Sequence, residues 1–175
     1  MFTVEKAKKI LSLIEEIKPE LKFCNINIVE SNKFAAEISL LDNTITIVNK
    51  IKDHSLNELM KGYIENNLKF NNSSYMFNSF METFAFLHEI GHIIDYLNND
   101  NSLDDREVQF TNYKDTKYTT IREQFNAYRS ISAEKFADLF AVEMLEKFKL
   151  NIWAIMENIT IEKAKEQEEF WLMFS

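Results

Sequence analysis

Apolar residues at helical spacing mark the beginning and the second half of the chain. From Val4 to Ile17 they recur every three or four positions and stop before Pro19, which predicts a first amphipathic helix. Helices are also expected from Ser55 to about Phe70 and from about 79 to 98–100, because each starts with a capping-box pattern of serine and, three residues later, glutamate. Further helices are predicted near residues 121–130, 132–149 and 152–174.

A different pattern fills the region between the first two helices. Residues 23–30, 34–40 and 44–48 carry apolar and β-branched side chains and are separated by short polar turns. We expect three strands in an antiparallel meander, with 34–40 or 44–48 at the edge of the sheet. At the other end of the chain, the apolar cluster at 170–174 is expected to dock against the core.

Length and composition indicate a helix-rich α+β protein. A chain of 175 residues with 46% hydrophobic content is long enough for one compact core and short for two, so residues 1–175 are predicted to form a single domain. Few glycines and prolines, together with long periodic segments, favour helices over an all-β fold. The single cysteine, Cys24, excludes an internal disulfide and is expected to be a core residue.

Charge and hydropathy limit the partners. The net charge of −8 argues against a nucleic-acid partner, whose phosphates require a basic surface. No segment approaches the length of a membrane span, and residues 1–6 lack the apolar run of a signal peptide. We therefore expect a cytoplasmic protein, or one that is secreted or injected without a cleavable signal peptide.

The sequence His88-Glu89-Ile90-Gly91-His92 carries the most specific chemistry, the H-E-x-x-H spacing. Residues four apart lie on one face of a helix, so two of the three histidines in the chain can bind the same metal ion. Glu89 lies beside them, where it could deprotonate a metal-bound water. Gly91 is one of two glycines, and its place inside a helix indicates close backbone packing beside the metal.

Catalytic zinc takes three protein ligands, so a third is needed. Asn98 stands where a metzincin would have its third histidine, and His54 is predicted to be an exposed loop residue, so a carboxylate is expected. The best candidate is Glu134, at the start of an apolar helical segment in which a buried carboxylate needs a partner. Asp138, one turn later, could accept a hydrogen bond from the outer nitrogen of one of the histidines.

These residues resemble a known group of peptidases. Residues 88–95, read as H-E-I-G-H-I-I-D, together with Tyr128 and the segment E-K-F-A-D-L-F from Glu134, are similar to the catalytic domain of anthrax lethal factor and the related Pro-Pro endopeptidases. The resemblance covers residues 80–145. It implies a zincin-like fold with a small antiparallel sheet and zinc ligands His88, His92 and Glu134. It also implies Glu89 as general base and Tyr128 as the phenol that stabilises the oxyanion.

The match departs from the pattern of the group at the tyrosine. Tyr128 lies six residues before Glu134 where seven is usual, so Tyr118 and Tyr96 remain alternatives. Asp138 stands where a glutamate is common, which gives the E-x-x-x-D form seen in thermolysin-like gluzincins. A second resemblance, to ImmA/IrrE-type metallopeptidases that cleave repressors, rests on H-E-I-G-H and E-K-F-A-D-L-F-A.

The sequence thus predicts a zinc-dependent endopeptidase that hydrolyses peptide bonds of a protein or peptide substrate. Residues 100–119, which show no sustained period, are expected to form a long loop that shapes the substrate cleft or covers it. Two alternatives stay open: a non-catalytic zincin-fold module that binds a partner protein, and a regulatory peptidase that cleaves a repressor. An intact Glu89 favours an enzyme, because a purely structural zinc site needs no base.

Overall fold

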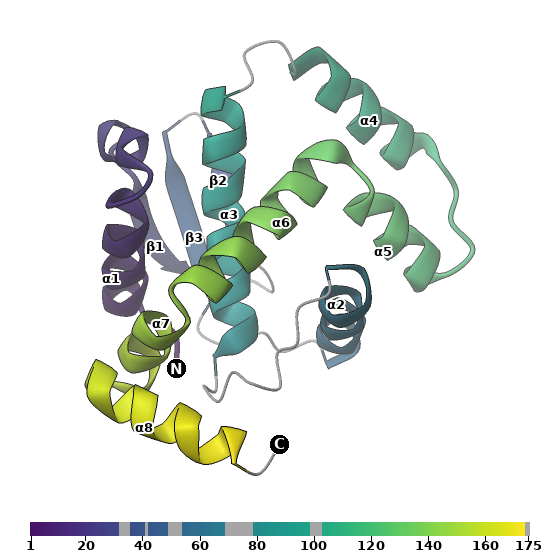
Figure 1. Ribbon diagram of the computed structural model, residues 1–175. Helices are drawn as coiled ribbons and strands as arrows, with labels where there is room; N and C mark the ends of the chain where they lie inside the picture. Colours follow the sequence, from purple (N-terminus) through teal and green to yellow (C-terminus); the bar gives the residue numbers. More distant parts are fainter. Residues whose placement is uncertain (32–35, 41, 49–53, 69–78, 99–102, 174–175) are drawn as a thin grey trace.

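The computed structural model describes residues 1–31, 36–40, 42–48, 54–68, 79–98 and 103–173 (Figure 1). Its helices are α1 (Val4–Glu15), α2 (His54–Asn67), α3 (Phe80–Asn98), α4 (Leu103–Asp115), α5 (Ile121–Arg129), α6 (Ser132–Lys147), α7 (Lys149–Glu157) and α8 (Ile161–Leu172). A short 3-10 helix, η1 (Pro19–Phe23), precedes the strands β1 (Asn27–Ser31), β2 (Glu37–Ser39) and β3 (Thr44–Val48). The prediction of a helix-rich α+β fold is confirmed.

The sheet is mixed, and the predicted antiparallel meander is wrong. Its order is β1-β3-β2, with β3 parallel to β1 and antiparallel to β2. The central place suits β3 because Ile45 and Ile47 are both buried, whereas in β2 Ile38 is only half-buried. The edges are therefore β1 and β2, and the alternative edge at 44–48 is excluded. The expected strand at 23–30 begins later, because Phe23 ends η1 and is exposed.

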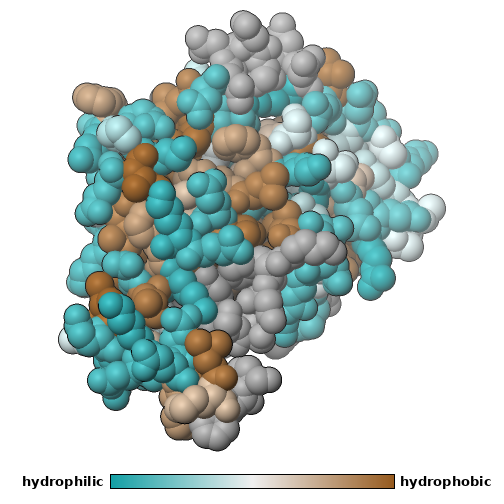
Figure 2. All heavy atoms as spheres, in the orientation of Figure 1, coloured by the Kyte–Doolittle hydropathy of each residue, from teal (hydrophilic) through white to brown (hydrophobic). Residues whose placement is uncertain are grey.

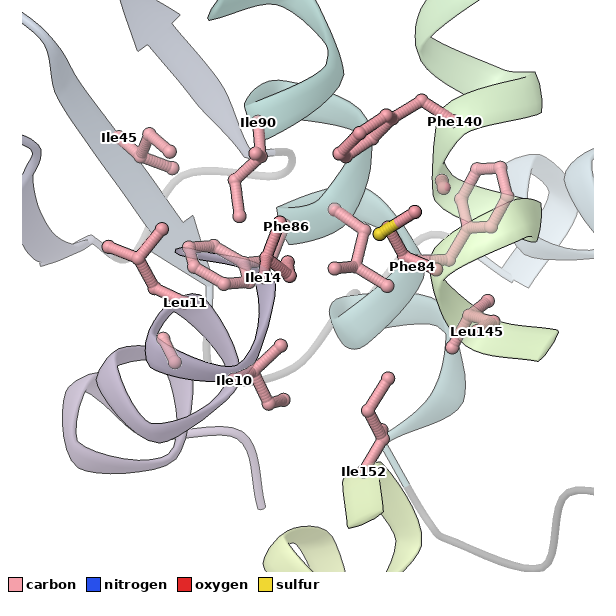
Figure 3. Packing of buried hydrophobic residues seen from close by; sticks show 14 of the residues in the cluster. Ile10, Leu11, Ile14, Ile45, Phe84, Phe86, Ile90, Phe140, Leu145 and Ile152 are labelled. Atoms are coloured by element: carbon pink, nitrogen blue, oxygen red, sulfur yellow. The ribbon is translucent and has the colours of Figure 1, made fainter. Parts of the chain in front are cut away.

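One buried face of the sheet carries the core. Helices α1 and α3 pack against it, and Figure 3 shows Ile10 and Ile14 of α1 and Ile45 of β3 around Phe86 of α3. The ring of Phe86 also lies 5.6 Å from that of Phe2, centroid to centroid. Cys24 belongs to the same cluster, as expected. This packing fixes α3, and with it the H-E-x-x-H segment, on the sheet.

Helix α6 crosses α3 at close range (Figure 1). The closest approach is at Gly91, where a Cβ atom would lie 2.8 Å from the Cα of Ala137 and 3.1 Å from its carbonyl oxygen. Real Cβ atoms essentially never come so near to backbone, so only glycine allows this separation of the helices. The expectation of close backbone packing at Gly91 is confirmed.

The predicted loop at 100–119 is wrong, because most of it is helix α4. No apolar stripe signals this helix in the sequence, because polar contacts and two ring contacts attach it to its neighbours. The rings of Phe110 and Tyr113 lie 6.2 and 5.4 Å from that of Tyr128, centroid to centroid. Arg106 pairs with Asp95 of α3 at 2.5 Å, and the side chain of Gln109 accepts a hydrogen bond from the backbone N–H of Ser132 at 2.8 Å. Helix α4 thus connects the end of α3 to the start of α6.

The end of the chain also differs from the prediction. The helix expected at 152–174 is two helices, because Asn158 adopts a left-handed conformation with φ 56° and ends α7. Trp153 and Ile152 of α7 fill the core, while the predicted docking of the C-terminal cluster is wrong for its described members: Phe170, Trp171, Leu172 and Met173 are 46–73% exposed. Phe174, the last residue of that cluster, lies outside the described residues. Figure 2 shows apolar surface around the end of α8. None of the described helices is both long and apolar enough to cross a membrane.

Candidate metal centre

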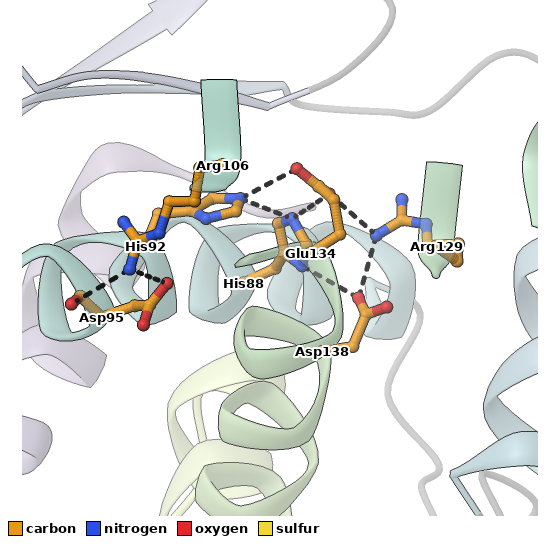
Figure 4. A network of polar contacts seen from close by, with 7 residues as sticks. All are labelled: His88, His92, Asp95, Arg106, Arg129, Glu134 and Asp138. Carbon is orange, nitrogen blue, oxygen red and sulfur yellow. Dashed lines mark hydrogen bonds and ion pairs between the residues drawn. The ribbon is translucent and has the colours of Figure 1, made fainter. Parts of the chain in front are cut away.

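Helices α3 and α6 bring together the three predicted metal ligands (Figure 4). The Nε2 atoms of His88 and His92 lie 3.0 Å apart. The carboxylate of Glu134 reaches both, with Oε2 at 3.2 Å from Nε2 of His88 and Oε1 at 3.4 Å from Nε2 of His92. His88 and Glu134 are buried and His92 is half-buried. The three side chains therefore lie just below the protein surface, and solvent reaches them at His92.

These three side chains fit a zinc ion. Ligand atoms at the usual zinc distance in a tetrahedral site lie about 3.3 Å from one another. The two histidine nitrogens are 3.0 Å apart, and each lies 3.2 or 3.4 Å from a different oxygen of Glu134, so the carboxylate is within reach of an ion held by both histidines. Among the described residues, Oε2 of Glu134 has no hydrogen-bond partner, although Glu134 is only 2% exposed. Its approach to His88 has the distance of an ion pair without the alignment of a hydrogen bond. A buried carboxylate oxygen in this state is ready to bind a cation.

Asp138 contacts the outer ring nitrogen of His88, as expected. Its Oδ1 lies 2.9 Å from Nδ1 of His88, which therefore carries the proton and leaves Nε2 facing Glu134 and His92. Burial by itself lowers the pKa of His88, but the hydrogen bond to Asp138 and the nearby carboxylate of Glu134 outweigh burial and raise that pKa to about 9. Without a metal, His88 is therefore an imidazolium at neutral pH.

The two glutamates are set apart by their surroundings. Burial alone would raise the pKa of Glu134, but the close approach and charges of His88 and His92 hold it well below its usual range. Glu89 is buried on the adjacent face of α3, and there burial dominates and raises its pKa, although the charges of both histidines oppose this. Glu134 is thus ionised and able to bind a cation, whereas Glu89 is suited to exchange a proton.

Of the three candidate tyrosines, Tyr128 is the one beside the ligands. Burial, followed by the charge of nearby Glu134, raises the pKa of Tyr128, so its phenol stays protonated. The hydroxyl of Tyr118 instead donates to the backbone carbonyl of Tyr113 at 3.1 Å. Tyr96 lies exposed on α3. His54, predicted in a loop, is the first residue of α2, and its side chain lies outside the described residues.

Sequence reasoning missed two residues that contact Asp138. Nη1 of Arg129 lies 2.9 Å from Oδ1 of Asp138 and 3.6 Å from Oε2 of Glu134. Tyr63 of α2 lies beside Asp138, and burial, followed by the charge of that carboxylate, raises the pKa of its phenol. A signal for Arg129 was present: the chain has only three arginines, and two buried aspartates on the site helices each need a cation. No such signal existed for Tyr63, which is far away in sequence.

Comparison with known proteins gives no family for this chain. No protein-family model matches it, and neither a curated protein nor a solved structure does. The resemblance to the lethal factor and Pro-Pro endopeptidase group therefore stays a prediction that rests on the motif residues.

Proposed function

We propose that the protein is a zinc-dependent endopeptidase. The observation that carries this proposal is the cluster of His88, His92 and Glu134, in which two histidine nitrogens 3.0 Å apart lie 3.2 and 3.4 Å from the two oxygens of one buried carboxylate, close enough together to bind one metal ion. Glu89 adjoins this cluster as a buried carboxylate with a raised pKa. A site that served stability alone would have no use for such a base.

In this proposal each side chain of the site has a separate role in hydrolysis. A zinc ion held by the three ligands would supply activation of a water molecule and polarisation of the scissile carbonyl. Glu89 accepts the proton of that water and delivers it to the leaving amine, a transfer for which its raised pKa suits it. The protonated phenol of Tyr128 donates a hydrogen bond to the developing oxyanion. Asp138 keeps His88 in the orientation and tautomer that zinc binding requires.

The sheet offers a place for an extended substrate. Strand β2 is an edge of the sheet, and α3 packs against β2 and β3. A peptide that adds to this edge would gain main-chain hydrogen bonds and run beside the motif helix. The proposed substrate is accordingly an extended or unfolded segment of a protein.

The test is a comparison of wild type with Glu89→Gln on an unfolded protein substrate, with cleavage sites read by mass spectrometry. The variant should keep zinc and fold but lose turnover by about 10²- to 10⁴-fold, the usual contribution of a general base. Glu143→Gln changes the same charge at an exposed position of α6 and should cleave like wild type. Equal cleavage by wild type and Glu89→Gln would refute the proposal, and zinc without any cleavage would favour the non-catalytic binding module.

A further inference from the structure

We propose that Arg129 is a positioning residue of the metal centre, which fixes the orientation of His88 and Glu134 through its contacts with Asp138 and Glu134 and thereby sets the affinity for zinc. The inference rests on the proposed zinc site and assigns a role to a residue outside the H-E-x-x-H and glutamate motifs. Figure 4 shows the guanidinium of Arg129 directed at both carboxylates of α6.

The side chain of Arg129 is held in one place. It is the last residue of α5, and only 16% of its side chain is exposed. The guanidinium carbon lies 5.6 Å from the ring centroid of Phe125 and 5.4 Å from that of Tyr128. Contacts of a guanidinium with two aromatic rings are favourable and restrict its motion. Arg129 is therefore a fixed donor, in contrast to a flexible surface arginine.

Its hydrogen bond determines how Asp138 can hold His88. Oδ1 of Asp138 accepts from Nη1 of Arg129 at 2.9 Å and also faces Nδ1 of His88 at 2.9 Å. With two donors on the same oxygen, the carboxylate has little freedom to rotate. Removal of Arg129 would release the carboxylate and, with it, the ring orientation that directs Nε2 of His88 at the metal position.

Charge gives Arg129 a second effect. Glu134 and Asp138 are both buried one turn apart on α6, so their ionised carboxylates repel each other. Histidines that bind a metal are neutral, which leaves the permanent charge of Arg129 next to both carboxylates, at 3.6 Å from Oε2 of Glu134 and 2.9 Å from Oδ1 of Asp138. Arg129 thus offsets the repulsion between the two carboxylates and holds Glu134 in place without itself being a ligand.

The test measures zinc affinity by competition with a chromophoric chelator, together with the visible absorption spectrum of the Co²⁺-substituted protein. Arg129→Met should bind zinc about 10- to 100-fold more weakly, as expected for loss of a group that orients ligands, and should shift the Co²⁺ bands. Arg129→Lys keeps the charge and should recover most of the affinity. Arg122→Met removes the same charge from an exposed position of α5 and should bind zinc like wild type.

The outcomes separate this inference from the proposed function. If Arg129→Met is less stable but its zinc affinity and Co²⁺ bands are unchanged, Arg129 contributes only to packing. That result would overturn the inference and leave the zinc site in place. A lysine variant as weak as the methionine variant would overturn the argument from charge. If Arg129→Met does not fold, Arg129→Gln replaces it with the same expected loss, and wild-type affinity in that variant overturns the inference. Wild type that binds no zinc overturns both proposals.

Discussion

Helix α3 has two buried sides of opposite chemistry. Toward α1 and the sheet it presents Phe86 and Ile90, which are fully buried among other apolar side chains. Toward α6 it presents His88 and His92, which meet the carboxylates of Glu134 and Asp138, and Glu89 is buried beside them. The first side stabilises the fold by removing apolar surface from water, whereas the second places charges where they are costly unless paired.

The two sides of α3 serve different purposes, stability on the apolar side and metal binding on the polar side. The apolar side needs only shape and hydrophobicity, and it fixes α3 whatever the polar side contains. The polar side depends on partners from two other helices, α5 and α6, and a metal ion would complete its charge balance. Substitutions on the two sides should therefore separate stability from metal binding, and each of the following predictions tests that separation.

The largest effect on stability is expected on the apolar side. Phe86→Ala should lower the free energy of unfolding by about 3–5 kcal/mol, because it removes a fully buried ring and leaves a cavity. Zinc affinity of the molecules that remain folded should not change. Urea unfolding and zinc titration check this, with Phe170→Ala, at a half-exposed position of α8, as the control that should cost little. Loss of zinc affinity in the folded protein would show that the two sides are coupled.

A pH-dependent loss of stability is expected on the polar side of the metal-free protein. His88 has a pKa of about 9 in the folded state against 6.5 when unperturbed, so its contribution is present below pH 6.5 and is lost as pH rises through 9. The loss is at most about 3 kcal/mol by linkage. Urea unfolding with a chelator at pH 6.5 and pH 9.5 measures it. His88→Gln should abolish the contribution of this residue, and an equal decline in that variant would assign it to other groups.

A substitution at Gly91, where α3 approaches α6, should change both stability and zinc binding. Gly91→Ala places a Cβ against the backbone of Ala137, and this overpacking should lower the free energy of unfolding by about 1–3 kcal/mol. The higher helix propensity of alanine should offset roughly 1 kcal/mol of that loss. By moving α6, the substitution should also weaken zinc binding. Gly62→Ala is the matched control, since a Cβ there meets nothing within 4 Å and should stabilise the protein slightly. Equal zinc affinity in both variants would contradict the role of the close approach.

Periodicity and spacing in the sequence were enough to predict most helices and the three candidate ligands. The H-E-x-x-H helix and the segment around Glu134 have strong apolar patterns, and a buried carboxylate there implied a partner. Helix α4 could not be predicted in this way, because an ion pair, hydrogen bonds and isolated ring contacts to other elements hold it in place of an apolar stripe. The order of the strands and the contacts of Arg129 and Tyr63 depend on tertiary packing, which local patterns do not encode.

The central claim is that His88, His92 and Glu134 form one zinc site, and metal content tests it most directly. Elemental analysis of purified wild type, Glu134→Ala and Glu143→Ala at known protein concentration should find one zinc per chain in wild type. Glu143→Ala, at an exposed position of the same helix, should match wild type, and Glu134→Ala should contain little zinc. No stoichiometric zinc in wild type, or equal zinc in all three proteins, would contradict the assignment of the site.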